Sequence, residues 1–185
     1  MQPQESAEHS WVTLRPTREG DAELLNLWRH EPTVGRYQPL GAITIERLRT
    51  ELATQDHRQL YQNHGDKFQW IIQYGDRPAG WITLVATNWN HGLAEIGYAL
   101  STPFQRQGIT PPALRQLLSD LFLNTTLERI EARCAIGNVG SRKVLEAIGF
   151  EREGLLRKYF VLQGKRVDNY LYAILREDFL RSQRS

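Results

Sequence analysis

The sequence predicts a mixed α/β domain, and three observations support this class. Seven segments alternate apolar and polar residues or are rich in β-branched and aromatic residues, as strands are. Segments with apolar residues at helical spacing separate some of them. One such helix lies between Leu100 and Arg129, so the strands on either side of it should be near-parallel neighbours.

The N-terminal part is expected to hold one strand and two helices. Residues 11–16 (WVTLRP) alternate and predict a strand. Residues 17–32 open with capping residues and carry leucines at helical spacing, and Pro32 should end that helix. Residues 44–62 predict a second helix on the same grounds.

Three strands and a helix follow. Residues 67–74 and 79–86 flank a GDRP turn and predict a hairpin, and residues 93–100 predict a third strand. The next helix has a regular apolar stripe, formed by Leu114, Leu117, Leu118, Leu121 and Phe122.

The C-terminal part predicts a strand, a short helix and a hairpin. Residues 129–136 alternate strictly. Residues 138–148 predict a helix that Gly149 closes in a left-handed conformation. The final hairpin is expected from residues 150–162 and 166–177, which flank the turn sequence QGK.

Length and composition limit the classes of function. The 185 residues suit one domain, predicted over residues 11–180 after a flexible lead-in at residues 1–10. A net charge of +2 offers no strong field for nucleic acid, and no apolar run is long enough for a membrane span. The N-terminus does not resemble a signal peptide, and the one cysteine, Cys134, fits a reducing cytosol. We therefore expect a cytoplasmic protein with no nucleic-acid or membrane partner. No metal site is expected either, because no histidine has carboxylates or cysteines at the spacing of metal ligands.

The stretch PFQRQGITPP, residues 103–112, predicts an anion site where a helix begins. The N–H groups there are free to bind an anion, and those before the two prolines belong to Gln105, Arg106, Gln107, Gly108, Ile109 and Thr110. Gly108 permits a positive φ and the close approach of a ligand, which suits a diphosphate. The stretch matches neither GxxxxGK[ST] nor GxGxxG. An ordinary helix start with a glycine turn is the alternative.

Several motifs together resemble one enzyme superfamily. QRQGIT resembles the Q/R-x-x-G-x-G/A signature of the GNAT acyl-CoA N-acyltransferases, in which backbone amides cradle the pyrophosphate of coenzyme A. NVGSRKVLEAIGFEREGLLR is similar to the N-x-x-S…LE-x-x-GF…EG motif of its RimJ/RimL-type N-acetyltransferases. AEIGYAL and GKRVDNYLYAILREDF resemble that family's fourth strand and C-terminal hairpin, so the resemblance runs from about Trp11 to Phe179.

The resemblance implies a fold and a reaction. The GNAT fold has about seven mostly antiparallel strands flanked by four helices, with a splayed parallel pair at the coenzyme A site. The implied reaction moves an acetyl group from acetyl-CoA, with no metal, to a primary amine. The pantetheine arm would pair with the backbone at Tyr98 and Leu100, where a backbone N–H would hold the oxyanion. Two departures are Thr110 at the last G/A of the signature and Leu145 where many members carry a catalytic tyrosine.

Glu95 is the candidate general base. It lies in a mostly apolar strand, where burial should raise its pKa and let it accept the proton of the amine directly or through water. The alternative is a carboxylate on an exposed strand face. Glu131 alternates with Arg129 and Arg133, and we interpret it as solvated and structural.

Ser141 is the second candidate catalytic residue. Its place in N-x-x-S implies that it hydrogen-bonds the leaving thiolate or the proton donor to it. The alternative is a first-turn serine that satisfies the helix terminus. Asn138 is a good N-cap, and the resemblance places its region beside the pantetheine arm. Cys134 is expected to be a small core residue.

The acceptor is expected to be the α-amine of a protein N-terminus. An α-amine has a pKa near 8 and a lysine side chain one near 10.4, so the α-amine is easier to deprotonate by roughly 3 kcal/mol. Small amines or antibiotics, and a catalytically silent module that binds coenzyme A, are the alternatives. Tyr37, Trp89 and Tyr170 are candidates for lining the acceptor groove. Asp168 matches an acidic position of the family's last hairpin and is a candidate for attracting the amine. A monomer and a homodimer are both compatible with the sequence.

Overall fold

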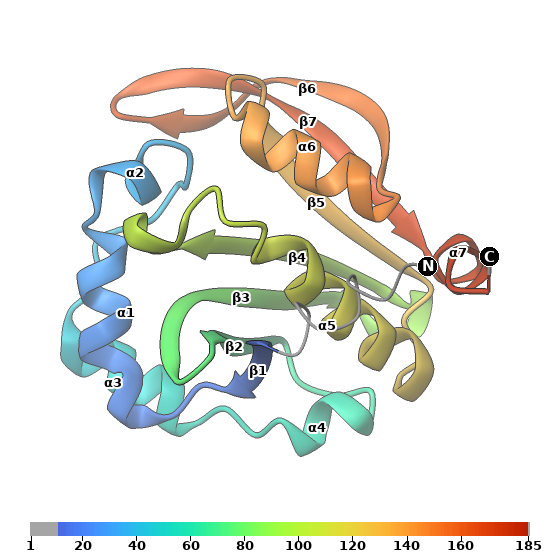
Figure 1. The fold of residues 1–185 in the computed structure, drawn as a ribbon, viewed down its shortest axis with the longest axis horizontal. Helices are drawn as coiled ribbons and strands as arrows, with labels where there is room; N and C mark the ends of the chain where they lie inside the picture. Colours follow the sequence, from blue (N-terminus) through green and yellow to red (C-terminus); the bar gives the residue numbers. More distant parts are fainter. Residues whose placement is uncertain (1–10, 185) are drawn as a thin grey trace, which may run out of the picture.

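The computed structural model describes residues 11–184, which form one twisted seven-stranded sheet with helices on both faces (Figure 1). The lead-in predicted for residues 1–10 lies outside the described residues. The order across the sheet is β1-β2-β3-β4-β5-β7-β6, and β4 and β5 are its parallel pair. The strands are β1 (Val12–Pro16), β2 (Lys67–Tyr74), β3 (Arg77–Asn88), β4 (Leu93–Leu100), β5 (Arg129–Ala135), β6 (Glu151–Leu162) and β7 (Lys165–Leu175). The predicted class and the mostly antiparallel sheet are confirmed.

The helical segments are more numerous than the four expected. The described residues contain α1 (Ala22–Arg29), α2 (Pro32–Gly35), α3 (Ile45–Ala53), α4 (Arg58–Tyr61), α5 (Thr110–Asn124), α6 (Val139–Ile148) and α7 (Arg176–Ser182), with short 3-10 turns η2 (Glu19–Asp21), η3 (Trp89–His91) and η4 (Thr102–Phe104). Two of these, α2 and α4, are single turns of four residues.

Three predicted boundaries are wrong for identifiable reasons. The first helix ends at Arg29, and Pro32 starts α2 because a proline at the first helical position lacks only an N–H that has no helical partner. The predicted helix over 44–62 divides, since Asp56 accepts a bond from the amide of Arg58 at 3.0 Å and starts α4 afresh. The last strand ends at Leu175 and α7 follows it.

Two apolar clusters lie on opposite faces of the sheet. The larger cluster packs α5, α6 and α7 against residues such as Trp70, Ile82 and Ile130. The smaller cluster packs α1, α2 and α3 against Ile71 and Trp81, which alternate with the first set along the strands. None of the helices in the described part of the chain is long and apolar enough to cross a membrane.

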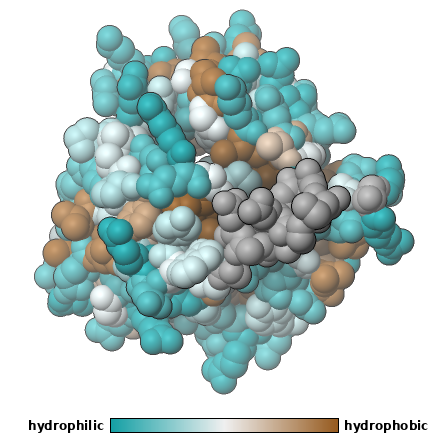
Figure 2. All heavy atoms as spheres, viewed as in Figure 1, coloured by the Kyte–Doolittle hydropathy of each residue, from teal (hydrophilic) through white to brown (hydrophobic). Residues whose placement is uncertain are grey.

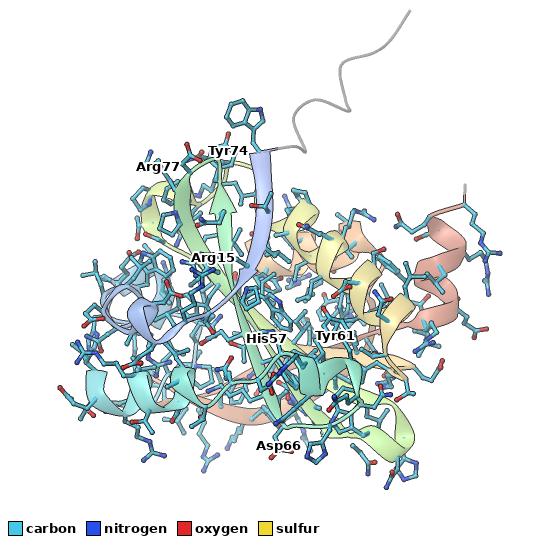
Figure 3. The ribbon with its side chains drawn as sticks, turned by 90° about the horizontal axis from the view of Figure 1, so that it is seen from below. Arg15, His57, Tyr61, Asp66, Tyr74 and Arg77 are labelled. Atoms are coloured by element: carbon cyan, nitrogen blue, oxygen red, sulfur yellow. The ribbon has the colours of Figure 1, made fainter. Side chains whose placement is uncertain are left out.

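Polar contacts attach the outer elements to this frame. Figure 3 labels two of the residues involved, Arg15 and Tyr61. Arg15 of β1 forms two 2.7 Å hydrogen bonds with the carboxylate of Asp21 in η2. Tyr61 of α4 donates a 2.7 Å hydrogen bond to Asp120 of α5. These contacts fasten the first strand to the turn before α1, and the α4 turn to the long helix.

The parallel pair is short, and this feature creates the site. Register holds for Leu93 with Arg129, Ala94 with Ile130 and Glu95 with Glu131, and pairing stops there. Beyond Glu95, β4 stays paired with β3 through Leu100, whereas β5 stays paired with β7. The two strands therefore separate towards their C-terminal ends, as the resemblance implied.

We expect Gly80→Ala to destabilise the protein by about 2 kcal/mol, because overpacking at a rigid contact costs that order of free energy. A Cβ at Gly80 would lie 2.2 Å from the backbone oxygen of Ala99, where β3 and β4 meet. Urea unfolding should show the loss. Gly97→Ala in β4 is the matched control, because a Cβ there meets nothing within 4 Å. Equal stabilities of the two variants would contradict the close contact.

Candidate active site

A cavity of about 670 Å³ opens where β4 and β5 separate. It is lined by residues within the ranges 33–39, 95–100, 105–111, 132–135 and 137–141, together with Val144, Leu145 and Phe160. In the space-filling view, hydrophobic residues are visible in the middle of the molecule, between the half that holds β5–β7 and the half that holds β1–β4, with mostly hydrophilic residues around them (Figure 2). The size is ordinary for a site that holds a small ligand or cofactor.

The structure brings nearly all of the sequence-predicted site residues to this cavity. Its lining includes Glu95, Tyr98, Leu100, Gln105, Arg106, Gly108, Ile109, Thr110, Asn138 and Ser141. Gln107 is the exception, because its side-chain amide turns back and donates to the carbonyl of Pro103 at 2.6 Å. The roles of these residues remain predictions, whereas the structure shows that they line one cavity.

The loop from η4 to α5 presents free backbone amides. Gly108 has φ 72°, in the left-handed region that its sequence position predicted. Arg106 has φ 62°, which the sequence did not predict, since a side chain in this region costs of order 1 kcal/mol. The amides of residues 106–110 donate no hydrogen bond to any other described residue. Positive φ values and free amides before a helix are the features of an anion-binding concavity.

A polar network fixes this loop to the segment that leads into α2. Glu31 accepts hydrogen bonds from the hydroxyl of Ser101 at 2.8 Å and from the amide and hydroxyl of Thr102, each at 2.6 Å. The Thr33 hydroxyl lies 2.7 Å from the Thr102 hydroxyl. The side-chain amide of Gln105 donates to the Thr33 hydroxyl at 3.1 Å. The loop on one side of the cavity and the start of the 33–39 segment on the other are thereby held together.

Glu95 lies on one face of the gap, in a charged network rather than the apolar surroundings predicted for it. Its carboxylate pairs with the guanidinium of Arg133, and both side chains are less than a third exposed. Glu131 lies beside Glu95 in the parallel register, and Arg133 approaches it at 3.7 Å. Arg129 continues the network, with bonds to Glu131 at 3.0 Å and Glu153 at 2.5 and 2.7 Å.

This network corrects two expectations. The apolar environment of Glu95 was inferred from its own strand, but the cross-strand neighbour Arg133 decides it. Glu131 is not separate from the site, since it shares Arg133 with Glu95. The side chain of Glu131 is 26% exposed, so it is less solvated than the sequence predicted.

Tyr98 and Ser141 form a hydroxyl pair on the other face of the gap. Their side-chain oxygens lie 2.8 Å apart, and burial raises the pKa of Tyr98, so the phenol stays protonated. The amide of Ser141 donates to Asn138 at 3.2 Å, which confirms Asn138 as the N-cap of α6. Ser141 therefore satisfies the helix start with its amide and remains available to the cavity with its hydroxyl.

The position of the expected tyrosine, Leu145, is a buried apolar part of the cavity wall one turn after Ser141. Tyr98 brings a phenol into the same region from β4. The sequence had suggested a role for the backbone of Tyr98 and none for its side chain. Alternation was the available signal, because it puts Tyr98 on the face of Ile96, which packs towards α5 and α6.

Cys134 is 3% exposed, as expected of a core residue, and it also lines the cavity. Burial raises the pKa of its thiol, and the thiol lies 3.6 Å from the carbonyl oxygen of Asn138. It is thus a protonated group beside the hydroxyl pair.

Of the four candidate residues for the acceptor groove, one lines the cavity and three do not. Tyr37 lines the cavity. Trp89 donates to the carbonyl of Gly65 at 2.7 Å and Tyr170 lies beneath Arg142, and neither lines it. Asp168 accepts a 2.7 Å bond from the amide of Lys158, so it supports the irregular turn of β6 rather than the cavity.

Two side-chain amides cover carbonyls on the edge of β4, which the sequence did not indicate. Gln38 donates to the carbonyl of Tyr98 at 2.7 Å, and Gln105 donates to that of Leu100 at 2.9 Å. The N–H of Ser101 donates to the carbonyl of Ala79 in β3. In an antiparallel pair, alternate residues direct their backbone groups towards and away from the partner strand. The backbone groups of Tyr98 and Leu100 therefore point away from β3 and into the gap.

Comparison with known families identifies the chain. The family model described as an acetyltransferase (GNAT) domain matches residues 12–151, and the chain belongs to this family. It is 27% identical over 168 residues to the uncharacterized N-acetyltransferase p20 of Bacillus licheniformis, covering 91% of this chain and 94% of that one. The chain is an N-acetyltransferase.

Solved structures share the fold. RimJ of Mycobacterium smegmatis, in complex with a coenzyme A disulfide, has a TM-score of 0.74 and 28% identity, over 90% of this chain and 83% of that one. RimL, a ribosomal L7/L12 α-N-protein acetyltransferase in complex with coenzyme A, has a TM-score of 0.77 and 24% identity, over 90% and 94%. The spermidine N-acetyltransferase of Vibrio cholerae, in complex with coenzyme A and spermine, has 0.79 and 21%, over 92% and 99%.

We expect Glu31→Gln to destabilise the protein by about 1 kcal/mol at neutral pH, after allowance for solvent screening of a partly exposed group. Burial alone would raise the pKa of Glu31, but the hydrogen bonds from Thr102 and Ser101 outweigh it and hold the pKa below its usual 4.5. The ionised carboxylate thus stabilises the fold above the unfolded pKa, and this contribution is lost as pH falls through the folded value.

Urea unfolding at a series of pH values would measure this difference. The difference in stability between the wild-type protein and Glu31→Gln should narrow as pH falls below the usual pKa of 4.5 and close below the lowered pKa of the folded state, because a protonated glutamate resembles glutamine. Glu151→Gln, at an exposed position of β6, is the control and should leave stability unchanged. A gap that persists in acid would remove the charge from the explanation.

Proposed function

We propose that this chain transfers the acetyl group of acetyl-CoA to the α-amine of a protein N-terminus, such as that of a ribosomal protein. The observation that carries the proposal is the gap between β4 and β5, which has a carboxylate on one face and a hydroxyl pair on the other. Such a gap suits a thioester placed between a proton acceptor and a proton donor.

The coenzyme would bind along the loop and the edge of β4. The free amides of residues 106–110 suit its pyrophosphate. The structures of RimJ and RimL, which share this fold, hold coenzyme A or its disulfide. The pantetheine amides would pair with the carbonyls of Tyr98 and Leu100, which now accept from Gln38 and Gln105. We propose no metal in this reaction.

Glu95 would take the proton from the attacking amine. It lines the cavity on the face that also carries Arg133 and Glu131. The guanidinium of Arg133 orients the carboxylate, and Glu131 shares its charge, so the base is held by partners on the neighbouring strand. Water carries the proton where the amine does not reach the carboxylate.

Ser141 and Tyr98 would return a proton to the leaving sulfur. Once the amine nitrogen bonds to the carbonyl carbon and the C–S bond breaks, the thiolate needs a donor. The Ser141 hydroxyl can give its proton to the sulfur and take the proton of Tyr98, whose phenol is protonated before the reaction. Glu95 then releases the proton of the amine to solvent, and Tyr98 recovers one from solvent. A backbone N–H on this stretch of β4 would hold the oxyanion of the tetrahedral intermediate.

The charges around the cavity favour an α-amine over a polyamine. Among the described residues that line it, Glu95 is the carboxylate, against the guanidinium groups of Arg36, Arg106 and Arg133. A polyamine such as spermine carries several positive charges and would need several carboxylates. An α-amine also loses its proton more readily than an alkylamine of higher pKa, by roughly 3 kcal/mol.

The same proposal places the enzyme in the cytoplasm, where acetyl-CoA and nascent protein N-termini meet. Cys134, the one cysteine of the chain, suits that reducing compartment. A small amine or antibiotic as acceptor, or a silent module that only binds coenzyme A, are the outcomes against which the proposal is tested.

We expect turnover of acetyl-CoA with short peptides that carry a free α-amine, and at least about tenfold lower kcat/KM with spermidine, following the charge argument. Release of free coenzyme A would measure the rate, and mass spectrometry would locate the acetyl group. Peptides blocked at the N-terminus but carrying lysine are the matched control. Preference for spermidine or for small amines would overturn the acceptor, and acetyl-CoA binding without turnover would show a silent module.

We expect Glu95→Gln to lower kcat by about 100-fold near neutral pH, the usual contribution of a general base, with little change in affinity for coenzyme A. The limb of the pH–rate profile that reports the base should disappear. Glu153→Gln is the matched control, since it removes a carboxylate from the same network at Arg129, without a contact to Arg133 or a place in the cavity lining. If the two variants lose activity equally, the network is only structural and Glu95 is not the base.

A further inference from the structure

A second cavity lies on the sheet face that α1 and α3 cover. Its volume is about 340 Å³, and it is lined by residues of those two helices, of the 41–43 segment and of the strands β2 and β3, with Gln55. None of its lining residues belongs to the lining of the active-site cavity. It is large enough for a small organic molecule.

The charged groups of this cavity are mostly positive. They are Arg29 from α1, Arg47 from α3 and Lys67 from β2, with Glu51 of α3 as the carboxylate among its lining residues. Glu51 accepts from Arg47 at 3.2 Å through one oxygen and from Lys67 at 3.3 Å through the other. Both carboxylate oxygens of Glu51 are therefore hydrogen-bonded, one to Arg47 and the other to Lys67.

Arg29 is left with little compensation for its charge. In the described part of the chain its guanidinium donates one hydrogen bond, to the carbonyl of Gly41 at 2.8 Å. Burial lowers the pKa of Arg29, and the nearby carboxylate of Glu51 offsets this only in part. A half-buried guanidinium with several unused N–H groups in a cavity is a site for an anion that two of them can bind.

The base of the cavity is apolar. Trp81 is 5% exposed and stacks on Trp28 with ring centroids 6.1 Å apart. Leu48 and Leu52 of α3 add aliphatic surface. An occupant would therefore need an apolar body as well as a negative charge.

We propose that this cavity binds a small organic carboxylate, with its carboxylate on Arg29 and Lys67 and its apolar part on Trp81. The proposal is independent of the acetyl transfer, because it concerns a different cavity. It commits to an anion, since a cation would meet three like charges and one carboxylate that is already paired.

One loop connects the two cavities. Arg36, Tyr37, Gln38 and Pro39 line the active-site cavity, and Gly41, Ala42 and Ile43 line the second one. Arg29 holds this loop at Gly41, and Gln38 holds it at the carbonyl of Tyr98. Arg29 therefore contacts the same loop that lines the active-site cavity.

Phenylacetate is the probe that tests the site, with phenylacetamide as its uncharged match. Titration of the full chain, followed by NMR of the tryptophan indole signals, should give saturable binding with a dissociation constant on the order of 1 mM, as expected for so small a ligand. Phenylacetamide should bind at least about tenfold more weakly, because it lacks the charge. Saturating coenzyme A should leave the phenylacetate binding site open.

Arg29→Met should weaken phenylacetate binding at least about tenfold while keeping the aliphatic stem. Lys67→Met tests the same site at a side chain that is 48% exposed, where substitution leaves the fold intact. Arg58→Met, at an exposed pair with Asp56 outside the cavity, is the control and should bind normally. Equal binding of the amide, binding that coenzyme A abolishes, or full binding by both Arg29→Met and Lys67→Met would overturn the proposal.

Discussion

The short pairing of β4 with β5 is the constraint on which the rest of the structure depends. Three residue pairs join the strands, and then each follows a different neighbour. Gly80 lets β4 approach β3 so closely that any side chain there would collide with the backbone of Ala99. On the other side β7 holds β5 along its full length. Each strand thus stays paired with its outer partner after the pairing between the two has stopped, and the sheet has an opening between them.

Strand alternation gives the two faces of this opening different chemistry. Glu95 and Tyr98 are three residues apart in β4, so their side chains leave the strand on opposite faces. One face carries a chain of carboxylates and guanidinium groups that crosses β4, β5 and β6. The other carries hydroxyl groups and a thiol against an apolar wall. A reacting group in the gap would meet a charged acceptor from one side and neutral donors from the other, without a barrier of protein between them.

Sequence patterns predicted the elements well where local rules decide the outcome. The strands at 67–74 and 93–100 have the predicted bounds, and Gly149 closes α6 with φ 108° as a left-handed glycine does. The errors arise where distant residues decide. Pro32 starts a turn that Glu31 anchors to Thr102, some seventy positions away, and Arg133 sets the surroundings of Glu95 from another strand. Gln38 and Arg106 lie outside any periodic pattern, because a loop side chain and a strained backbone angle leave no regular signal.

The two glutamines on the edge of β4 change what a binding constant means for this protein. In the free chain, Gln38 and Gln105 already satisfy the carbonyls of Tyr98 and Leu100. A molecule that pairs with this edge exchanges one set of amide hydrogen bonds for another of similar strength, so the exchange itself contributes little free energy. The measured affinity is then a difference between two bound states, one internal and one external. Gln38 and Gln105 therefore compete with such a molecule for these two carbonyls, although both glutamines also line the cavity that would hold it.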